Sequence, residues 1–152
     1  MDTPYRIRPA GTPDLPQVAA IERQVFSDPW SAGAFVDVLW QGTSWVAEAQ
    51  GHVAGYLIGR AAADEAEVLN LAVAPFHRRR GIGTALLEYA LLRFREAGAR
   101  RAFLEVRESN RSAQDFYRTH GFHLVGRRRF YYSRPAEDAL ILAREMAPFP
   151  PA

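Results

Sequence analysis

The stretch from Glu67 to Thr84 constrains the fold more than any other part of this sequence. Its first half, Val68–Val73, is apolar and β-prone and is bounded by a proline, which is typical of a buried strand. Its second half is a basic turn with two glycines, followed at residues 85–92 by helix-forming side chains. A helix N-terminus at such a turn binds anions, because its first N–H groups lack acceptors within the helix and its dipole adds positive potential. We therefore predict a pyrophosphate site here, with Arg78–Arg80 adding positive charge.

The bulk composition excludes several classes of function. The 152 residues are enough for one domain with a core, which we expect to span residues 1–146, with 147–152 as a short tail. The absence of cysteine excludes disulfides, thiolate metal sites and a cysteine nucleophile, and the four histidines lack zinc-ligand spacing, so no metal is expected. A net charge of +2 is too small to indicate a nucleic-acid or membrane partner. With no secretory signal and no stretch as long as a membrane span, the chain is expected to be cytoplasmic.

The hydrophobic pattern predicts a mixed α/β sheet with a parallel βαβ centre, antiparallel outside and flanked by helices. Strands are expected over residues 5–8, 43–49, 52–60, 68–73, 101–107, 122–132 and 138–145. Helices are expected from Thr12 to a break at Asp28, from Ser31 through Trp40 to a stop at Gly42, from Ala85 to a stop at Gly98, and from Asn110 to Gly121. Gln50-Gly51 indicates a tight hairpin turn, and residues 61–66 are expected to be a connection.

A dinucleotide-binding fold is the first alternative for the glycine turn. Gly81 and Gly83 supply the first two glycines of that fingerprint, and Glu105 lies about 20 residues further on. However, the third glycine position is Leu86, the first glycine comes well after the strand ends near Val73, and hairpin strands precede the unit. A P-loop is excluded because that motif needs lysine and all 19 basic residues are arginine.

The chain resembles the GNAT acetyltransferase superfamily in two motifs. Residues Arg78 to Gly83 match its acetyl-CoA signature, an Arg or Gln followed by Gly-x-Gly, and Leu71–Pro75 matches the lead-in to it. Asn110 to Phe122 then matches the second motif, N-x-x-A-x-x-F-Y-x-x-x-G-F. The two motifs have the right separation, and the resemblance covers essentially the whole chain. It implies a single-domain GNAT-like fold and acetyl-CoA as the acyl donor.

Within the superfamily the chain is most similar to the ribosomal-protein N-terminal alanine acetyltransferases (RimI type). This narrower resemblance depends on Phe26 with Pro29–Ser31, on Leu104–Asn110, and on Arg128–Tyr132 followed by Asp138-Ala139. In that group the acceptor is the N-terminal α-amine of a protein, notably the N-terminal alanine of a small-subunit ribosomal protein. The expected partners are therefore acetyl-CoA and the N-terminal segment of an acceptor protein.

The resemblance also implies which residues bind the donor. Main-chain groups of the 71–73 strand would pair with the pantetheine arm and polarise the thioester carbonyl, and N–H groups of residues 79–84 would hold the pyrophosphate. Asn110 would cap its helix and contact CoA. The predicted donor-binding residues are Leu71, Ala72, Val73, Arg78, Arg79, Arg80, Gly81, Ile82, Gly83, Thr84 and Asn110.

Glu105 is the candidate general base. The nucleophile must be a neutral amine, and an α-amine with a pKa of about 7.7–8.0 needs less help than lysine at about 10.4. Strand alternation places Glu105 on the face opposite Leu104 and Val106, where it could take the proton directly or through a water. A surface glutamate paired with a neighbouring arginine, Arg101 or Arg107, is the alternative interpretation. Glu67 is a rival base, because some members of the superfamily use the strand before the phosphate turn.

Tyr117 is the candidate general acid, which the resemblance implies would protonate the departing CoA thiolate. A core aromatic beside Phe116 is the alternative, and a buried hydroxyl would then need a partner. Trp30, Tyr131 and Tyr132 are candidates for the acceptor groove, although aromatic residues in such loops often serve packing.

Together these features predict an N-acetyltransferase in which the amine attacks the thioester directly, without a covalent enzyme intermediate. One alternative is the same chemistry on a small-molecule amine or on lysine. Another is a non-catalytic acyl-CoA-binding regulatory module, against which the presence of both Glu105 and Tyr117 argues. Nucleic-acid binding through Arg127–Arg129 is weakly indicated, because the basic run is short.

Overall fold

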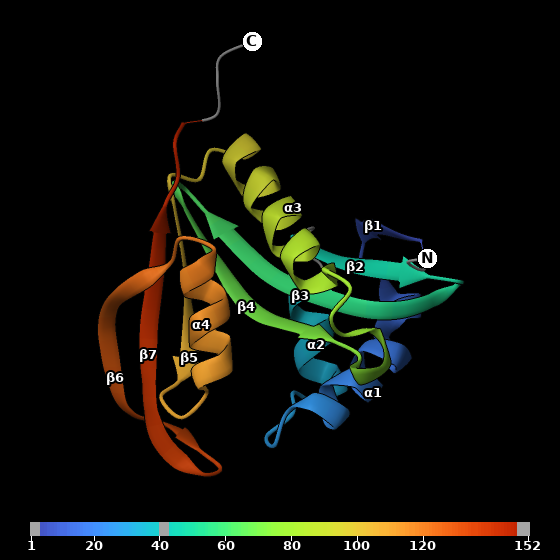
Figure 1. The fold of residues 1–152 in the computed structure, drawn as a ribbon, viewed down its shortest axis with the longest axis horizontal. Helices are drawn as coiled ribbons and strands as arrows, with labels where there is room; N and C mark the ends of the chain where they lie inside the picture. Colours follow the sequence, from blue (N-terminus) through green and yellow to red (C-terminus); the bar gives the residue numbers. More distant parts are fainter. Residues whose placement is uncertain (1–3, 40–42, 149–152) are drawn as a thin grey trace. The chain divides into compact units, whose positions relative to one another are not determined.

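The computed structural model describes residues 4–39 and 43–148, and its elements follow the predicted order (Figure 1). The strands are β1 (Tyr5–Pro9), β2 (Ser44–Ala49), β3 (His52–Ala62), β4 (Glu65–Val73), β5 (Arg101–Arg107), β6 (His123–Ser133) and β7 (Ala136–Glu145). The helices are α1 (Leu15–Val25), α2 (Ala32–Leu39), α3 (Ile82–Glu96) and α4 (Arg111–Thr119), with 3₁₀ turns at Thr12–Asp14 and Pro75–His77. None of the helices within the described ranges is long and apolar enough to cross a membrane.

The strands form one mixed sheet in the order β1-β2-β3-β4-β5-β7-β6. The pair β4–β5 is parallel, whereas β1–β2, β2–β3, β5–β7 and β6–β7 are antiparallel, as the sequence predicts. The turn between β2 and β3 contains only Gln50 and Gly51, which both have positive φ, 53° and 79°. Two left-handed residues are the signature of a type I′ hairpin, so the predicted tight turn is confirmed.

Residues 61–66 differ from the expectation of a connection. β3 continues through Ala62 and β4 begins at Glu65, so the turn is limited to Ala63 and Asp64. Alanine and glutamate have low strand propensity, but here the ladder of backbone hydrogen bonds extends the strands beyond the β-prone residues. The predicted helix end at Trp40 and Gly42 lies outside the described residues, as do positions 149–152 of the predicted tail. A domain boundary at residue 146 stays a prediction.

The chain divides into two compact units, residues 1–60 with 69–93 and residues 61–68 with 94–152. In the first unit, α1 and α2 cover one face of strands β1–β3 and α3 covers the other (Figure 1). Adjacent residues of β2 show this division: Val46 joins the core formed with α1 and α2, whereas the Trp45 ring packs edge-on against Tyr89 of α3 at 5.9 Å.

Helix α3 approaches β3 closely at Gly55. A Cβ at this position would lie 2.9 Å from the carbonyl oxygen of Ala72 and 3.3 Å from methyl groups of Ile82 and Leu86. A carbon atom does not fit within 3.0 Å of a carbonyl oxygen, so only glycine allows this packing. The close approach of both β4 and α3 to β3 at this point therefore depends on a residue without a side chain.

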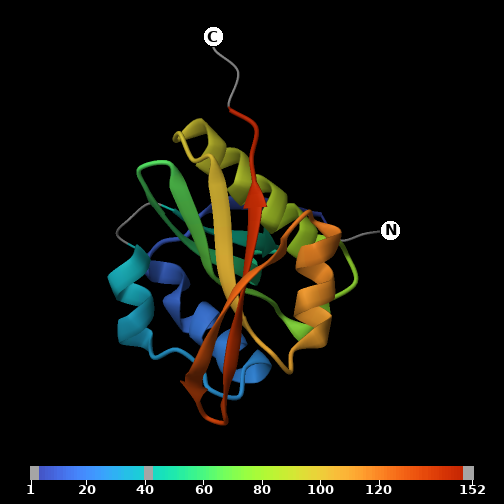
Figure 2. The ribbon, with the colours of Figure 1, turned by 90° about the vertical axis from the view of Figure 1, so that its left-hand side faces the viewer.

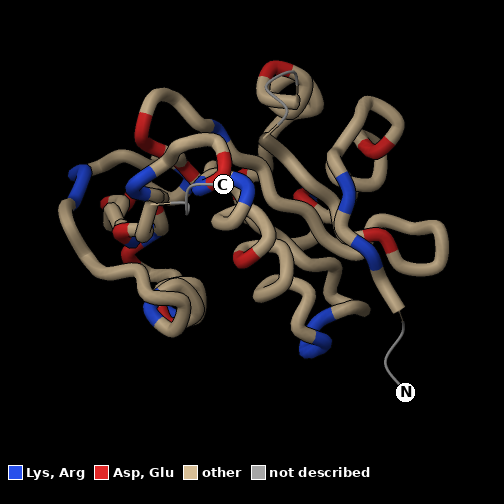
Figure 3. Tube along the Cα trace, turned by 90° about the horizontal axis from the view of Figure 1, so that it is seen from above, with Lys and Arg blue, Asp and Glu red and all other residues tan. Residues whose placement is uncertain are grey.

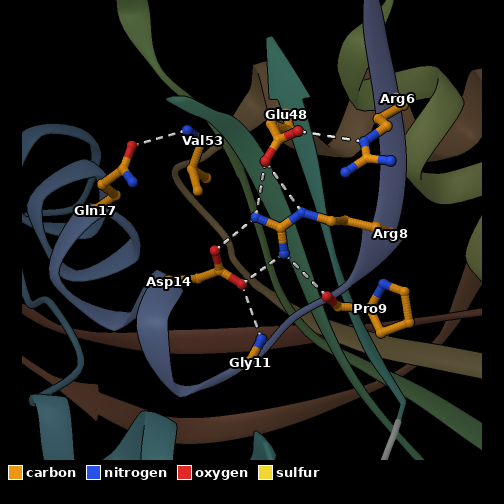
Figure 4. A network of polar contacts seen from close by, with 8 residues as sticks. All are labelled: Arg6, Arg8, Pro9, Gly11, Asp14, Gln17, Glu48 and Val53. Carbon is orange, nitrogen blue, oxygen red and sulfur yellow. Dashed lines mark hydrogen bonds and ion pairs between the residues drawn. The ribbon is translucent and has the colours of Figure 1, made fainter. Parts of the chain in front are cut away.

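An ion-pair network fixes β1 to the start of α1 (Figure 4). The Arg8 guanidinium donates to both carboxylate oxygens of Asp14, at 2.8 and 2.9 Å, and to Glu48 of β2. Asp14 also accepts the Gly11 N–H at 2.8 Å. These bonds lower the pKa of Asp14, the hydrogen bond from Arg8 being the largest cause. Figure 3 shows basic and acidic residues interspersed along the chain.

The second unit is built on β5, β7 and β6. Its β5 residues alternate as predicted: Ala102, Leu104 and Val106 are buried, whereas Phe103 and Glu105 are half-buried on the opposite face. The first residues of β4 pair with β5 in parallel, from Glu65 opposite Arg101 to Val68 opposite Leu104. Helix α4 lies on one face of β5 and β7 (Figure 2).

Candidate functional site

The donor half of the predicted site belongs to the first unit. β4 ends at Val73, a 3₁₀ turn follows, and α3 begins at Ile82, so Gly83 and Thr84 lie within the first turn of the helix. The Ala85 N–H donates to the Gly81 carbonyl at 3.0 Å. In an α-helix the N–H groups before such a bond point beyond the helix end, which is the geometry that binds phosphate oxygens.

The backbone of this turn is sharply curved. Arg79 and Gly81 both have positive φ, 65° and 75°. Glycine adopts this conformation without strain, whereas arginine does so at a cost that is often found at functional loops. The Arg80 guanidinium lies 5.7 Å above the ring of Phe76, which is 81% exposed. The structure thus combines a curved backbone, a helix N-terminus and cationic side chains, as the pyrophosphate prediction requires.

Other predicted donor-binding residues are placed as follows. Leu71 and Val73 are half-buried and Ala72 is buried on β4, in the first unit. Asn110 belongs to the second unit, where its Oδ1 accepts the Ala113 N–H at 3.2 Å and caps α4, as predicted. Contacts of these residues with CoA stay predictions.

The candidate bases line a pocket in the second unit. Its volume is about 250 Å³. The pocket is lined by Glu65, Glu67, Arg101, Phe103, Glu105, Val125, Arg128 and Ile141. Glu67 and Glu105 therefore share one face of the sheet, and the structure keeps both as possible proton acceptors. Among residues 4–39 and 43–148, no group of three or more histidine and acidic side chains is placed to hold a metal ion.

Glu105 is held by two groups of β6. Arg128 Nε lies 2.9 Å from its Oε1, and the Tyr131 hydroxyl donates to the same carboxylate, which is the largest cause of the raised pKa of Tyr131. The partners suggested by the sequence are engaged elsewhere: Arg101 pairs with Glu145 at 3.0 Å and Arg107 with Glu137 at 3.1 Å. Sequence reasoning therefore missed Arg128 as the partner of the candidate base.

A bulge in β6 brings Arg128 and Tyr131 to the same carboxylate. Arg128 pairs with Ala139 and Tyr132 with Glu137, so three residues of β6 lie opposite Asp138 alone. Residues three apart in a regular strand point to opposite faces, and a bulge changes that relation.

Asp138 holds this bulge through both carboxylate oxygens. Its Oδ1 accepts the N–H of Phe130, whose φ is 52°, at 2.9 Å. Its Oδ2 accepts from Arg127 at 2.8 Å, and Arg127 also pairs with Glu108 at 2.9 Å. Within the basic run, Arg127 and Arg128 are thus paired with carboxylates.

Tyr117 is buried on α4 between Phe116 and Phe122, with ring centroids at 5.2 and 5.6 Å. This packing is what the alternative of a core aromatic predicts. However, none of the described residues forms a hydrogen bond with its hydroxyl. Burial of the residue raises the pKa of Tyr117, so the hydroxyl stays protonated and can act as a donor. A donor without a protein partner is consistent with a ligand acceptor.

The three aromatic residues suggested for the acceptor groove differ in their surroundings. Tyr132 lies under the Arg107 guanidinium, 4.2 Å from it, and burial raises its pKa to about 12. Tyr131 is 51% exposed and reaches Glu105. Trp30, in the first unit, packs on Phe35 at a centroid distance of 5.1 Å. Packing thus accounts for Tyr132 and in part for Trp30, whereas Tyr131 is exposed to an incoming ligand.

Comparison with known proteins defines the class of the enzyme. Residues 15–122 match the acetyltransferase (GNAT) family, and the chain belongs to it. It is 35% identical over 145 residues to a putative [ribosomal protein bS18]-alanine N-acetyltransferase of Bacillus subtilis, covering 93% of this chain and 96% of the relative. It is 36% identical over 137 residues to the [ribosomal protein bS18]-alanine N-acetyltransferase of Escherichia coli, covering 87% and 91%.

Solved structures agree with this assignment. The ribosomal-protein-S18-alanine N-acetyltransferase of E. coli superposes with a TM-score of 0.84 at 35% identity, covering 94% of this chain and 96% of that one. Ard1 of Thermoplasma volcanium superposes with a TM-score of 0.90 at 27% identity, covering 94% and 98%. The predicted GNAT-like fold, N-acetyltransferase activity and acetyl-CoA donor are therefore confirmed, and a non-catalytic module is not favoured.

Proposed function

We propose that this enzyme acetylates the N-terminal alanine of the ribosomal protein bS18, with acetyl-CoA as the donor. The observation that carries the proposal is the 35–36% identity to bS18-alanine N-acetyltransferases over nearly the full length of both chains. Such an acceptor would be met in the cytoplasm, where ribosomes assemble. Small-molecule amines and lysine are less favoured, because these relatives at 35–36% identity are named as alanine N-acetyltransferases.

The acceptor amine must lose a proton before it attacks. Its nitrogen then forms a bond to the thioester carbonyl carbon and the C–S bond breaks. The nitrogen loses its second proton to give the amide, and the CoA thiolate takes up a proton and leaves as the thiol. Glu105 is the proposed base: it lines a pocket and its side chain is 19% exposed, so we propose that an N-terminal ammonium reaches its carboxylate. Because the α-amine pKa is close to neutral, part of the amine is already neutral at pH 7, and less help from a base is needed than for lysine.

Tyr117 is the proposed donor of a hydrogen bond to the leaving sulfur. A thiol has a reference pKa of about 8.5, below that of a buried tyrosine, so the proton is shared with the thiolate more than it is transferred. That hydrogen bond stabilises the charge as it develops, because the donor is fixed by packing before the reaction starts. The main-chain groups of Leu71–Val73 and Arg79–Thr84 are proposed to bind the pantetheine arm and the pyrophosphate.

The test is acetyl transfer from acetyl-CoA to peptides that share one sequence and differ only at residue one. The sequence should be the N-terminus of bS18, with alanine, serine, glycine or methionine first, and mass spectrometry should locate the acetyl group. An N-terminally blocked peptide with an internal lysine and spermidine are the controls. Turnover of the alanine peptide alone supports the proposal, whereas turnover mainly on lysine or spermidine contradicts it.

A further inference from the structure

The first unit contains a buried carboxylate that forms no part of the proposed donor site. Glu22 of α1 is only 1% exposed. Its Oε2 accepts the backbone N–H of Trp30 at 2.9 Å, and its Oε1 accepts Nδ2 of Asn70 at 2.6 Å and the hydroxyl of Tyr56. All three partners are donors, which matches a carboxylate that acts only as an acceptor.

The partners of Glu22 come from three separate segments. Trp30 lies in the connection between α1 and α2, Tyr56 on β3, and Asn70 on β4 immediately before the predicted donor-binding residues 71–73. Burial and the bond to Glu22 raise the pKa of Tyr56, which keeps its hydroxyl a donor. One side chain thus links the α1–α2 connection to the strand that is proposed to bind the acyl donor.

Glu22 accepts a hydrogen bond from the backbone of the α1–α2 connection and not from one of its side chains. The Glu22 carboxylate fixes the amide of Trp30, and the indole packs on Phe35, whose ring meets Tyr56 edge-on at 5.9 Å. Connections of this kind are usually mobile, and ordering them on binding reduces affinity. Here the buried carboxylate fixes the backbone before a ligand arrives.

Stability alone does not account for this cluster. Replacing a buried charged network by well-packed apolar side chains is often neutral or stabilising, whereas removal of one partner is costly. An apolar residue at position 22 would fill the core but would leave the Trp30 amide without its acceptor. The network therefore determines where the connection lies.

We infer that Glu22 is a positioning residue for acceptor binding: it fixes residues 26–31 so that this segment is preformed for the peptide N-terminus. The inference rests on the proposed function and on Trp30 as an acceptor contact. It assigns Glu22 no role in proton transfer.

The test compares Glu22→Gln with Asp14→Asn, a second buried carboxylate of the same unit that contacts Arg8 and not Trp30. In Glu22→Gln the new NH₂ group faces donors, so at least one of the three bonds is lost. We expect the KM for the alanine peptide to rise about tenfold, with kcat within threefold and the KM for acetyl-CoA within twofold. We also expect faster hydrogen–deuterium exchange at the Trp30 amide. Asp14→Asn should lower Tm without either effect.

The outcomes separate this inference from the proposed function. If the wild-type enzyme acetylates no peptide N-terminus, the proposed function fails and the acceptor role of Glu22 fails with it. If the wild type is active and Glu22→Gln leaves both the peptide KM and the Trp30 exchange unchanged, the inference alone is overturned. An equal rise in both KM values, or the same rise in Asp14→Asn, also overturns it, because a general loss of stability would then explain the data.

Discussion

Nε of Arg128 lies 2.9 Å from Oε1 of Glu105, so the proposed base is ion-paired before any substrate binds. The pair joins β5 to β6, two strands that are not neighbours in the sheet, because β7 lies between them. Arg128 pairs regularly with Ala139, and the bulge that follows it, opposite Asp138, brings Tyr131 to the same carboxylate. Arg128, Tyr131 and Asp138, all from the β6–β7 hairpin, therefore determine the orientation of a carboxylate on β5.

Arg128→Met and Asp138→Ala should each lower kcat for the alanine peptide by roughly tenfold, because small displacements of a catalytic group are costly. Both act through the orientation of Glu105, so the double variant should be no slower than the slower single variant. Steady-state kinetics of the three variants checks this. Asp115→Asn, which loses only the exposed pair with Arg118, is the control with unchanged kcat. Additive losses would mean that Asp138 acts elsewhere.

Glu105→Gln should reduce kcat/KM for the alanine peptide by about 10²-fold at pH 7, the range expected for a general base. The loss should shrink at pH 9, because an α-amine with a pKa of about 8 is then mostly neutral without help. Rates measured from pH 6.5 to 9.5 test this, with Glu67→Gln as the matched variant from the same pocket. If Glu67→Gln shows the pH-dependent loss and Glu105→Gln does not, Glu67 is the base.

Tyr117→Phe should lower kcat by about 10²-fold and leave Tm nearly unchanged. The hydroxyl has no hydrogen-bond partner among the described residues, so its removal breaks no hydrogen bond within the protein. Thermal unfolding and single-turnover kinetics provide the two measurements. A fall in Tm with unchanged kcat would indicate a purely structural tyrosine.

Gly55→Ala should destabilise the protein by about 1–3 kcal/mol, because the added methyl group clashes with the Ala72 carbonyl oxygen of β4 and crowds Ile82 and Leu86 of α3. It should also weaken acetyl-CoA binding, since relief of the clash moves Ala72, a predicted donor-binding residue. Gly33→Ala is the matched control: it lies within α2, where the nearest atom to a new Cβ is 3.9 Å away. That variant should gain about 0.5–1 kcal/mol from helix propensity. Urea unfolding and calorimetry with acetyl-CoA measure both effects.

Asp14→Asn should destabilise the protein by about 1.5–3 kcal/mol at pH 7, because it removes charge-assisted bonds from Arg8. The pKa of Asp14 is lowered in the folded protein from a model-compound value of 3.8, so its ionised form stabilises the fold above that pH. The stabilisation is lost as the pH falls through the folded-state value. The difference in unfolding free energy between wild type and variant should therefore be constant from pH 5 to 7 and shrink below pH 4. A difference independent of pH would contradict the ion-pair explanation.

Local patterns were enough to predict the elements that carry the site. The alternation of Arg101–Arg107 placed Glu105 on the correct face, and Asn110 was correctly predicted as a helix cap. These features depend on residues that are close in sequence. The full extent of β3 and β4 was not predicted from such local patterns. Cross-strand pairing extends these strands, and not the propensity of Ala61 or Ala66.

Contacts between distant segments could not be predicted in this way. A regular strand sends Arg128 and Tyr131 to opposite faces, so only knowledge of the bulge brings both to Glu105. Glu22 is separated from Tyr56 by 34 residues and from Asn70 by 48. Acidic side chains are seldom fully buried unless they are paired, so the residue type alone does not indicate that Glu22 is buried. The hydrogen-bond donors that allow Glu22 to be buried come close to it only in the folded chain.

Glu22 accepts a hydrogen bond from the backbone amide of Trp30 and not from its indole, so the acceptor preference of related enzymes can change without loss of this bond. Every amino acid except proline supplies that amide, so the path of the chain around position 30 is independent of the side chain placed there. Exchanging Trp30 would then reshape the surface offered to a peptide while the backbone remains where Glu22 holds it. The backbone amide of residue 30 thus fixes the path of the chain, whereas its side chain can change the acceptor preference.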